Sequence, residues 1–364
     1  MIAPNQFRQP PPMVDMPLLT AIIILCTISM VVLYSAGGED IYFLSRQGAR
    51  IGFAASLMFL FARIPPSMLV RWSPILYGIG LLLLVIVLGV GIVGKGAQRW
   101  LELGGFRFQP AEPMKLVVPM MVAWILSRSP LPPPAAAIFL SMLVVLLPVV
   151  LVIAQPDFGT AILIFLAGGV VIFLAGIGWK MLVWATAAAG AAVPMLWTLV
   201  LHDYQRSRIL TLFDPWADPL GAGYHIIQSV IAVGSGGIHG KGWLTGTQSR
   251  LEFIPERTTD FIFSVYAEEF GFLGALLLVG LYLFIGLRGL MISFHANDTY
   301  SRLLGGCLSA TFFFYVFVNI GMTAGILPVV GVPLPLLSHG GSAMVTLMIG
   351  LGILMSIHRH KKMP

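Results

Sequence analysis

Residues 135–154 read AAAIFLSMLVVLLPVVLVIA, a run of twenty residues without a charged side chain. A helix needs about 20 apolar residues to cross the roughly 30 Å hydrocarbon core of a bilayer. The whole chain has the same character, because 58% of its 364 residues are hydrophobic and only 10% are charged. Soluble domains carry about 25% charged residues. The sequence therefore predicts a membrane protein.

Comparable apolar runs predict about ten transmembrane helices and an all-α polytopic membrane protein with a single domain over residues 1–364. Residues 1–16 are Pro-rich and lack the charged start and cleavage site of a signal peptide, so the first run is expected to remain as a span. The one large extramembrane piece expected is 201–260, between helices 7 and 8. The runs begin near Pro17, Gln47, Pro74, Glu112, Ala135, Phe158, Met181, Phe261, Leu303 and Gly341.

Lys and Arg in the short loops set the expected orientation. With the N-terminus in the cytoplasm, every short inner loop carries at least one of them, and both tails, 1–16 and 358–364, lie inside. The other 11 of the 21 basic residues fall outside or in the membrane, mainly over 95–115 and 206–257. These two segments are either solvated loops of mixed charge or a site for a pyrophosphate-bearing substrate, and composition is compatible with both.

Polar residues gather at the start of the predicted fourth span, in FRFQPAEPMK (106–115). Arg107, Gln109, Glu112 and Lys115 are candidates there for binding a ligand. Glu112 and Lys115 stand three residues apart, so they share a helix face and can form an ion pair. Charges at this depth are costly and indicate function; the alternative is an ion pair that fixes helix packing.

The long outer segment is rich in glycine, with GAG at 221–223 and VGSGGIHGKG at 233–242. Glycine permits positive φ and close approach of the backbone, so this segment could wrap a ligand. It lacks the G-x-x-x-x-G-K-[ST] pattern of a phosphate-binding P-loop. The moderately apolar run from Tyr224 to Val233 is expected to form a helix lying in the membrane interface.

Asp260 stands where this polar segment meets the predicted eighth span, with Glu256 and Arg257 crowded beside it. A carboxylate near a helix N-terminus is favoured by the helix dipole, so an N-cap is one interpretation. The other is a general base that acts on a sugar hydroxyl at the rim of a cavity.

Glu268 and Glu269 lie about 12 Å deeper than Asp260, at 1.5 Å per helical residue. Two adjacent carboxylates inside a span are hard to explain by packing alone, so Glu268 is a candidate site residue. Lys115 and Arg107 are the expected counter-ions of these acids.

Two other outer connections hold candidates. Asp157, in QPDFGT, has equal support as a cap of the sixth helix and as a substrate contact. The prolines and glycines of 325–341 predict non-helical backbone at membrane depth, which is tolerated only where protein or a cavity covers it. Ser338 and Ser342 can donate hydrogen bonds to a ligand there. His339 is expected to be a satisfied polar group, since the histidines show no zinc spacing.

Five motifs stand out together: KGAQRW (95–100), FQPAEPMK (108–115), QPDFGT (155–160), FIPERTTDFIFSVYAEEFG (253–271) and GVPLPLLSHGGSAM (331–344). With them the chain resembles the SEDS family (shape, elongation, division and sporulation) from its first span to its last, and most closely the branch that determines rod shape. The resemblance implies a peptidoglycan glycosyltransferase of the bacterial inner membrane, whose active site faces the periplasm. Such enzymes polymerise lipid II, a disaccharide-pentapeptide on undecaprenyl pyrophosphate.

The resemblance also implies roles for residues and partners. The family's essential carboxylate stands in P-E-x-x-T-D-F, here Asp260, and is thought to deprotonate the acceptor's sugar hydroxyl. Arg107, Gln109, Glu112 and Lys115 would line the central cavity, with a divalent cation (Mg²⁺ or Mn²⁺) near the pyrophosphate and no organic cofactor. The expected partners are a class B penicillin-binding protein, which is a transpeptidase, and the elongation proteins MreC and MreD, with no nucleic acid.

Two positions depart from the family pattern. Many members have His where this chain has Thr258, and Ser where it has Ala111, so neither an imidazole nor a hydroxyl can be required there. Two other functions remain as alternatives: a lipid II flippase, and a non-catalytic scaffold for a transpeptidase. The inner loops are short and nearly free of acids, which favours chemistry on one face over transport, and a scaffold leaves the outer carboxylates unexplained.

Overall fold

Six helices in the described part of the chain are long and apolar enough to cross a membrane: α1 (Met16–Ala36), α3 (Pro66–Val90), α5 (Ala135–Ile153), α11 (Ile262–Phe294), α12 (Thr299–Thr323) and α13 (Ser342–Arg359). The computed structural model describes residues 14–361 except 95–96, 104–105, 180, 182, 184–185, 188–189, 192–193, 195–196, 199–202, 220, 222, 252 and 255. Most of these residues are helical, as the composition predicted.

Three further predicted spans coincide with helices that are shorter or more polar. They are α2 (Ile41–Arg63), α4 (Ala111–Leu126) and α6 (Phe158–Leu174). The predicted start of α2 near Gln47 was too late, because Asp40 caps the helix earlier: its carboxylate accepts from Tyr42 N at 2.8 Å. The span predicted from Met181 lies largely outside the described residues.

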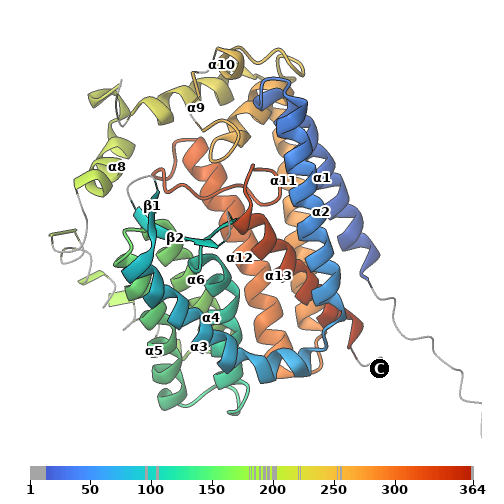
Figure 1. Ribbon diagram of the computed structural model, residues 1–364, viewed down its shortest axis with the longest axis vertical. Helices are drawn as coiled ribbons and strands as arrows, with labels where there is room; N and C mark the ends of the chain where they lie inside the picture. Colours follow the sequence, from blue (N-terminus) through green and yellow to red (C-terminus); the bar gives the residue numbers. More distant parts are fainter. Residues whose placement is uncertain are drawn as a thin grey trace, which may run out of the picture.

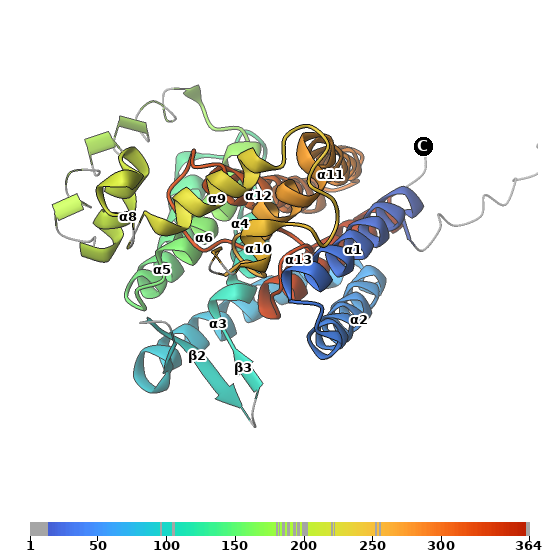
Figure 2. The ribbon, with the colours of Figure 1, turned by 90° about the horizontal axis from the view of Figure 1, so that it is seen from above.

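A small antiparallel sheet corrects the all-α expectation. Strands β1 (Ile92–Gly94), β2 (Ala97–Leu103) and β3 (Phe106–Phe108) pair in the order β1-β2-β3, with Glu102 opposite Arg107. Polar and apolar residues alternate in LEL (101–103) and FRF (106–108), which is the period of two that a strand requires. Seen from above, β2 and β3 project from the edge of the bundle beside α3 (Figure 2).

The outer segment folds into short helices across one end of the bundle: α8 (Asp203–Phe213), the 3₁₀ turn η2 (Pro215–Ala217), α9 (Tyr224–Ser235) and α10 (Thr247–Arg250) (Figure 1). The helix predicted from Tyr224 is thus confirmed as α9. At the opposite end Asp15, which precedes α1, accepts from Arg288 at 2.6 and 3.1 Å and lies 3.6 Å from His358 of α13. The described ends of the chain therefore lie together, away from the outer segment.

α12 lies in the middle of the bundle and packs against α4, α6, α11 and α13 (Figure 2). Between α12 and α13 the chain is non-helical, as predicted, and buried helix side chains donate hydrogen bonds to three of its carbonyl groups. Tyr282 donates to Pro335 O at 2.8 Å and Ser29 to Leu337 O at 2.9 Å. This connection is therefore fixed inside the bundle, where it borders the candidate site.

Candidate functional site

Asp260 lies half-buried in the turn that leads into α11. The helix begins at Ile262, its N-cap residue is Phe261, and no side chain caps it. The interpretation of Asp260 as an N-cap is therefore wrong.

Three hydrogen bonds hold the backbone at Asp260 and join it to the connection between α12 and α13. The Asn319 amide nitrogen, on α12, donates to Asp260 O at 2.9 Å and to Val332 O at 2.7 Å. The Ser338 hydroxyl donates to Thr259 O at 2.6 Å. Asn319 is 0% exposed, so these bonds form away from water and hold the turn firmly against the 324–341 connection.

The carboxylate of Asp260 faces Gly331 in that connection. Gly331 has φ +70°, and a Cβ built on it would stand 3.5 Å from Asp260 Oδ2. The residue before it, Val330, touches the start of α6, since a Cβ on Gly159 would lie 2.7 Å from Val330 O. The pair 330–331 therefore separates Asp260 from the first turn of α6.

A buried polar cluster lies at that first turn. Gln109 donates to Asp157 Oδ2 at 2.7 Å, and Arg99 Nη1 is 3.6 Å from the same oxygen. Asp157 Oδ1 accepts from Thr160 N at 3.3 Å. Asp157 thus caps α6 and also joins two polar side chains from the segment before α4, so the capping interpretation is confirmed without excluding a contact to substrate.

Glu112 and Lys115 form the ion pair that their spacing predicted. Lys115 Nζ lies 2.6 Å from Glu112 Oε1, and the two residues are 4% and 6% exposed respectively. Lys115 Nζ also stands 5.3 Å from the ring centroid of Tyr315 on α12. Glu112 Oε2 is buried and has no hydrogen-bond partner.

α12 connects the two halves of the site. Tyr315, beside Lys115, and Asn319, which holds Asp260, are four residues apart and therefore share a helix face. Four residues correspond to about 6 Å along a helix axis. The candidates on α4 and the turn at Asp260 thus border one region beside α12 and the 330–332 segment, although they are far apart in sequence.

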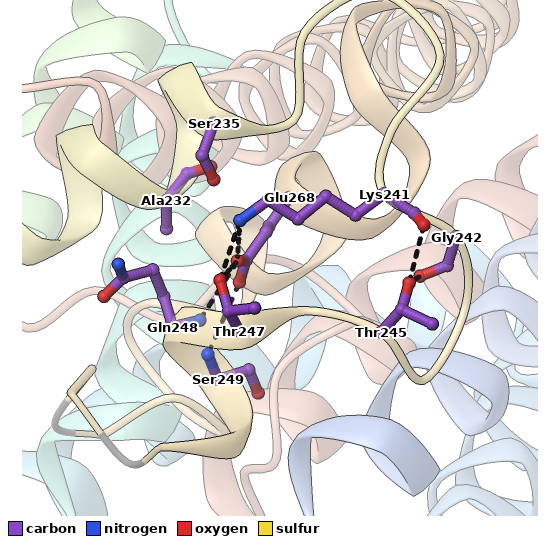
Figure 3. A network of polar contacts seen from close by, with 9 residues as sticks. All are labelled: Ala232, Ser235, Lys241, Gly242, Thr245, Thr247, Gln248, Ser249 and Glu268. Atoms are coloured by element: carbon purple, nitrogen blue, oxygen red, sulfur yellow. Dashed lines mark hydrogen bonds and ion pairs between the residues drawn. The ribbon is translucent and has the colours of Figure 1, made fainter.

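Glu268 belongs to a different network, shown in Figure 3. It is 0% exposed, and Lys241 Nζ lies 2.7 Å from its Oε1. The same carboxylate accepts from Thr247 Oγ1 at 3.1 Å and from the backbone N of Gln248 and Ser249 at 3.0 and 3.4 Å. The predicted counter-ions were wrong for Glu268: its partner is Lys241, and Lys115 pairs with Glu112.

The glycine-rich stretch 233–242 packs against α11. A Cβ on Gly236 or Gly240 would lie 2.1 Å from the carbonyl oxygen of Ala267 or Glu269. α11 itself is interrupted at Gly271, where φ is +66° and ψ is −165°. Glycine is needed at these positions for close approach between two backbones, which differs from the predicted wrapping of a ligand.

The other predicted site residues are placed as follows. Arg257 donates to Ala36 O at 2.8 Å and to Ser249 O at 2.5 Å, so it joins the outer segment to α1. Glu256 is exposed, and its carboxylate accepts from Thr259 at 2.9 Å. Ser342 is the first residue of α13. Arg107 lies on β3, and its side chain is outside the described part of the structure.

The sequence analysis missed three residues that the geometry brings forward. Asn319 is a polar residue inside an apolar span, which is by itself a signal of function. In the sequence analysis Arg99 stood only within the motif KGAQRW, and Lys241 only within the glycine-rich stretch. Their partners lie 58, 59 and 27 residues away in the chain for Arg99, Asn319 and Lys241, so local spacing could not reveal them.

Within the described residues no group of three or more His, Cys, Asp or Glu side chains could hold a metal ion. Two carboxylates of the site, Glu112 and Asp157, already have a cationic neighbour. A metal cage built from protein ligands alone therefore does not fit the described side chains. Mg²⁺ can instead be bound through one or two carboxylates together with substrate phosphates.

Comparison with known proteins places these features in context. A family model for FtsW, RodA and SpoVE, described as "Cell cycle protein", matches residues 12–363. The peptidoglycan glycosyltransferase MrdB of Escherichia coli K12 is 51% identical over 349 residues, which cover 96% of this chain and 94% of MrdB. The MrdB of Helicobacter pylori is 36% identical, over 85% of this chain and 81% of its own length.

Two solved structures are similar over nearly the whole chain. One is reported under "Structural coordination of polymerization and crosslinking by a peptidoglycan synthase complex"; it has a TM-score of 0.83 at 35% identity and covers 96% of this chain and 99% of its own. The other is the rod shape determining protein RodA of Thermus thermophilus, with a TM-score of 0.73 at 29% identity and coverage of 96% and 98%.

Proposed function

The chain belongs to the FtsW/RodA/SpoVE (SEDS) family of peptidoglycan glycosyltransferases, and from this premise we propose that it polymerises lipid II with Asp260 as general base. The reaction lengthens glycan strands during cell elongation. Its substrate class follows from the activity by which MrdB, the 51% identical relative, is named.

One observation carries the assignment of Asp260. Its backbone is fixed by Asn319, and its neighbour Thr259 by Ser338, while the carboxylate itself stands half-buried against a glycine. A general base must be held within hydrogen-bond reach of the proton it removes. Fixing the main chain orients the carboxylate without the side chain being enclosed in the core.

The chemistry then follows from the positions of the charges. Asp260 removes the proton from the acceptor sugar hydroxyl, whose oxygen attacks the anomeric carbon of the donor. The bond from that carbon to the pyrophosphate breaks, and undecaprenyl pyrophosphate leaves with the electron pair. Arg107, Gln109, Glu112, Lys115, Asp157 and Glu256 contribute polar contacts around the two substrates. Ser338 acts on the backbone, through its hydrogen bond to Thr259 O.

A divalent cation, Mg²⁺ or Mn²⁺, would be held with the substrate phosphates and would supply positive charge near the leaving group. Glu112 Oε2 is the candidate protein ligand, because it is buried, lies in the α4 cluster and has no hydrogen-bond partner. The remaining ligands would be phosphate oxygens and water.

The proposed topology has ten spans, both termini in the cytoplasm and the site facing the periplasm. Its support is that the described ends of the chain lie together near Asp15, while α8–α10 cover the opposite end of the bundle (Figure 1). The proposed partners are a class B penicillin-binding protein, in line with the polymerising and crosslinking complex of the similar structure, and MreC and MreD.

The test is polymerisation of purified lipid II by the purified protein with its transpeptidase partner. Asp260→Asn is isosteric and should lower the rate by about 10²–10⁴-fold, the usual contribution of general acid–base catalysis, at an unchanged melting temperature. Normal strand synthesis by a folded Asp260→Asn protein would show that Asp260 is not the general base. If the wild type made no strands but moved lipid II across vesicle membranes, the protein would be a flippase. If it did neither but activated its transpeptidase partner, it would be a non-catalytic scaffold.

A further inference from the structure

A second cluster of polar side chains lies at the outer end of α2, beside the turn of Asp260. Arg46, Gln47 and Arg50 occupy one stretch of this helix. Arg50 contacts the ring of His339, and His339 N donates to Thr258 O at 2.7 Å, two residues before Asp260. No part of the proposed mechanism uses these three side chains.

Neither Arg46 nor Arg50 forms an ion pair with an acid among the described residues. None of the described ion pairs within 4 Å includes either of them. The nearby acids are engaged elsewhere, Glu39 with Arg250 at 2.9 Å and Asp40 as the cap of α2. By contrast Arg99 and Lys115, on the other side of the site, each have a carboxylate beside them.

His339 adds no charge of its own to the cluster. It lies in the connection before α13, and burial, followed by the charges of Arg50 and Arg46, lowers its pKa to about 4. The ring is therefore neutral at pH 7 and accepts a hydrogen bond from Arg50. The cluster keeps two net positive charges.

Gln47 is the unusual member of the cluster. It is 0% exposed, yet neither its amide nitrogen nor its amide oxygen has a hydrogen-bond partner. A buried polar side chain left in this condition costs free energy. Gln47 is thus a buried donor and acceptor that the protein itself does not use.

The packing of α2 and α13 places Gln47 at the start of α13. The two helices run parallel: a Cβ on Gly352 would lie 2.3 Å from Met58 O, and Ser356 further along contacts Ile64 O. Phe43 and Arg50, four residues before and three residues after Gln47 on the same face of α2, both contact the ring of His339, which stands two residues before Gly341, the N-cap of α13. No side chain caps this helix end, and a Cβ on Gly340 or Gly341 would meet nothing within 4 Å.

We propose that Arg46, Gln47 and Arg50, with the uncapped start of α13 and the Ser342 hydroxyl, bind the pyrophosphate of a lipid-linked substrate. An uncapped helix start and arginine side chains both favour phosphate oxygens. Two arginines without an ion pair to any described acid match the two negative charges of a pyrophosphate diester. The inference rests on the proposed function for the identity of the substrate. It gives the site a net positive anion subsite opposite the charge-paired cluster at α4.

The test measures binding of farnesyl pyrophosphate, a soluble isoprenyl pyrophosphate, to the full-length protein by titration calorimetry. Arg46→Gln and Arg50→Gln should each weaken binding about tenfold or more, because each removes a charge-assisted hydrogen bond. Arg50→Lys should recover part of the loss. The matched control is Arg71→Gln, an exposed arginine near the other end of the bundle, which should bind normally.

Gln47→Leu separates a ligand role from a structural one. Removal of a buried unpartnered amide should leave the melting temperature unchanged or raise it, while binding of the probe weakens. Asp260→Asn should bind the probe normally even when polymerisation is lost, so a failure of the catalytic assignment remains distinguishable from a failure of this one.

Three results would overturn the proposal. They are unchanged affinity in the double variant Arg46→Gln/Arg50→Gln, equal binding of farnesol, and a Gln47→Leu protein that loses stability but not affinity. Nanodiscs that contain phosphatidylglycerol serve as the competing source of phosphate. If they displace the probe as well as inorganic pyrophosphate does, the cluster is a general site for anionic headgroups.

Discussion

Two carboxylates near the outer end of α11, Asp260 and Glu268, stand eight residues apart and have different roles. Glu268 is fully buried, and its oxygens are occupied by an ammonium group, a hydroxyl and two backbone N–H groups (Figure 3). Asp260 is half-buried, and the Asn319 amide holds its main-chain carbonyl. The sequence analysis had grouped both as site residues.

This difference distinguishes an acidic residue that stabilises the fold from one that is positioned for catalysis. A carboxylate that receives several internal donors stabilises the segment that supplies them. A carboxylate whose backbone is fixed while its side chain stands at the rim is positioned to exchange a proton with a ligand. Four substitutions test this distinction.

The largest effect on stability is expected from Glu268→Ala. This change leaves Lys241 without its partner and the start of α10 without its acceptors, so it should cost about 3 kcal/mol of stability, as when a buried ion pair loses one member. Hydrogen exchange of residues 241–251 should rise and the melting temperature should fall. Lys241→Met should give a comparable loss; a fully stable but inactive Glu268→Gln protein would contradict the structural role.

Asn319→Leu should act on catalysis more than on substrate affinity. It removes both hydrogen bonds that hold Asp260 O and Val332 O, each worth about 1 kcal/mol, so kcat should fall by about tenfold or more with KM for lipid II little changed. The control is Ser73→Ala, a buried polar residue that contacts Tyr300. An equal drop in kcat for both variants would argue against a specific role of Asn319.

Gly331→Ala tests the neighbour of the Asp260 carboxylate. A side chain at φ +70° costs about 1–2 kcal/mol, and the new methyl group would touch Oδ2. We expect a several-fold lower kcat. Gly325→Ala has nearly the same backbone strain, at φ +74°, but its Cβ would meet Val230 and Ile226. That variant should lose stability and keep its kcat; if both retain full activity, Gly331 does not shape the site.

The smallest effect is expected from Arg250→Gln. Arg250 pairs with Glu39 at 2.9 Å, but the two side chains are 60% and 46% exposed, and exposed ion pairs contribute about 0.2–1 kcal/mol. The melting temperature should barely move, and added salt should not change the result. A loss as large as that of Glu268→Ala would show that burial does not separate the two ion pairs of this outer segment.

The sequence alone predicted contacts correctly where the two interacting residues are close in the chain. Glu112 and Lys115 are one helical turn apart, so their pairing followed from spacing alone, and the long apolar runs predicted most of the helix starts. Lys241 and Glu268, or Asn319 and Asp260, meet only because α9–α10 and α12 fold against α11. No local pattern records such contacts, and for that reason the wrong counter-ions were assigned to Glu268.

The short sheet shows a second limit of prediction from the sequence. The alternation in LEL (101–103) and FRF (106–108) was available, but strands of three to seven residues give a weak periodic signal beside spans of about twenty. Gln47 shows a third, because its burial depends on the parallel packing of α2 and α13. Gln47 was predicted only as the start of a span, and a glutamine between two arginines gives no sign of burial until that packing is known.

The contact between the glycine-rich stretch and α11 also limits how this protein can be altered. Lys241 N and Gly242 N donate to the carbonyls of Glu268 and Glu269, while Phe272 N and Leu273 N donate to those of Gly237 and Ile238, all at 2.9–3.1 Å. An insertion or deletion between 238 and 241 would shift one side of this ladder against the other. The stretch can therefore change its exposed side chains, such as Ile238, but not its length, which makes it a poor place for an epitope tag.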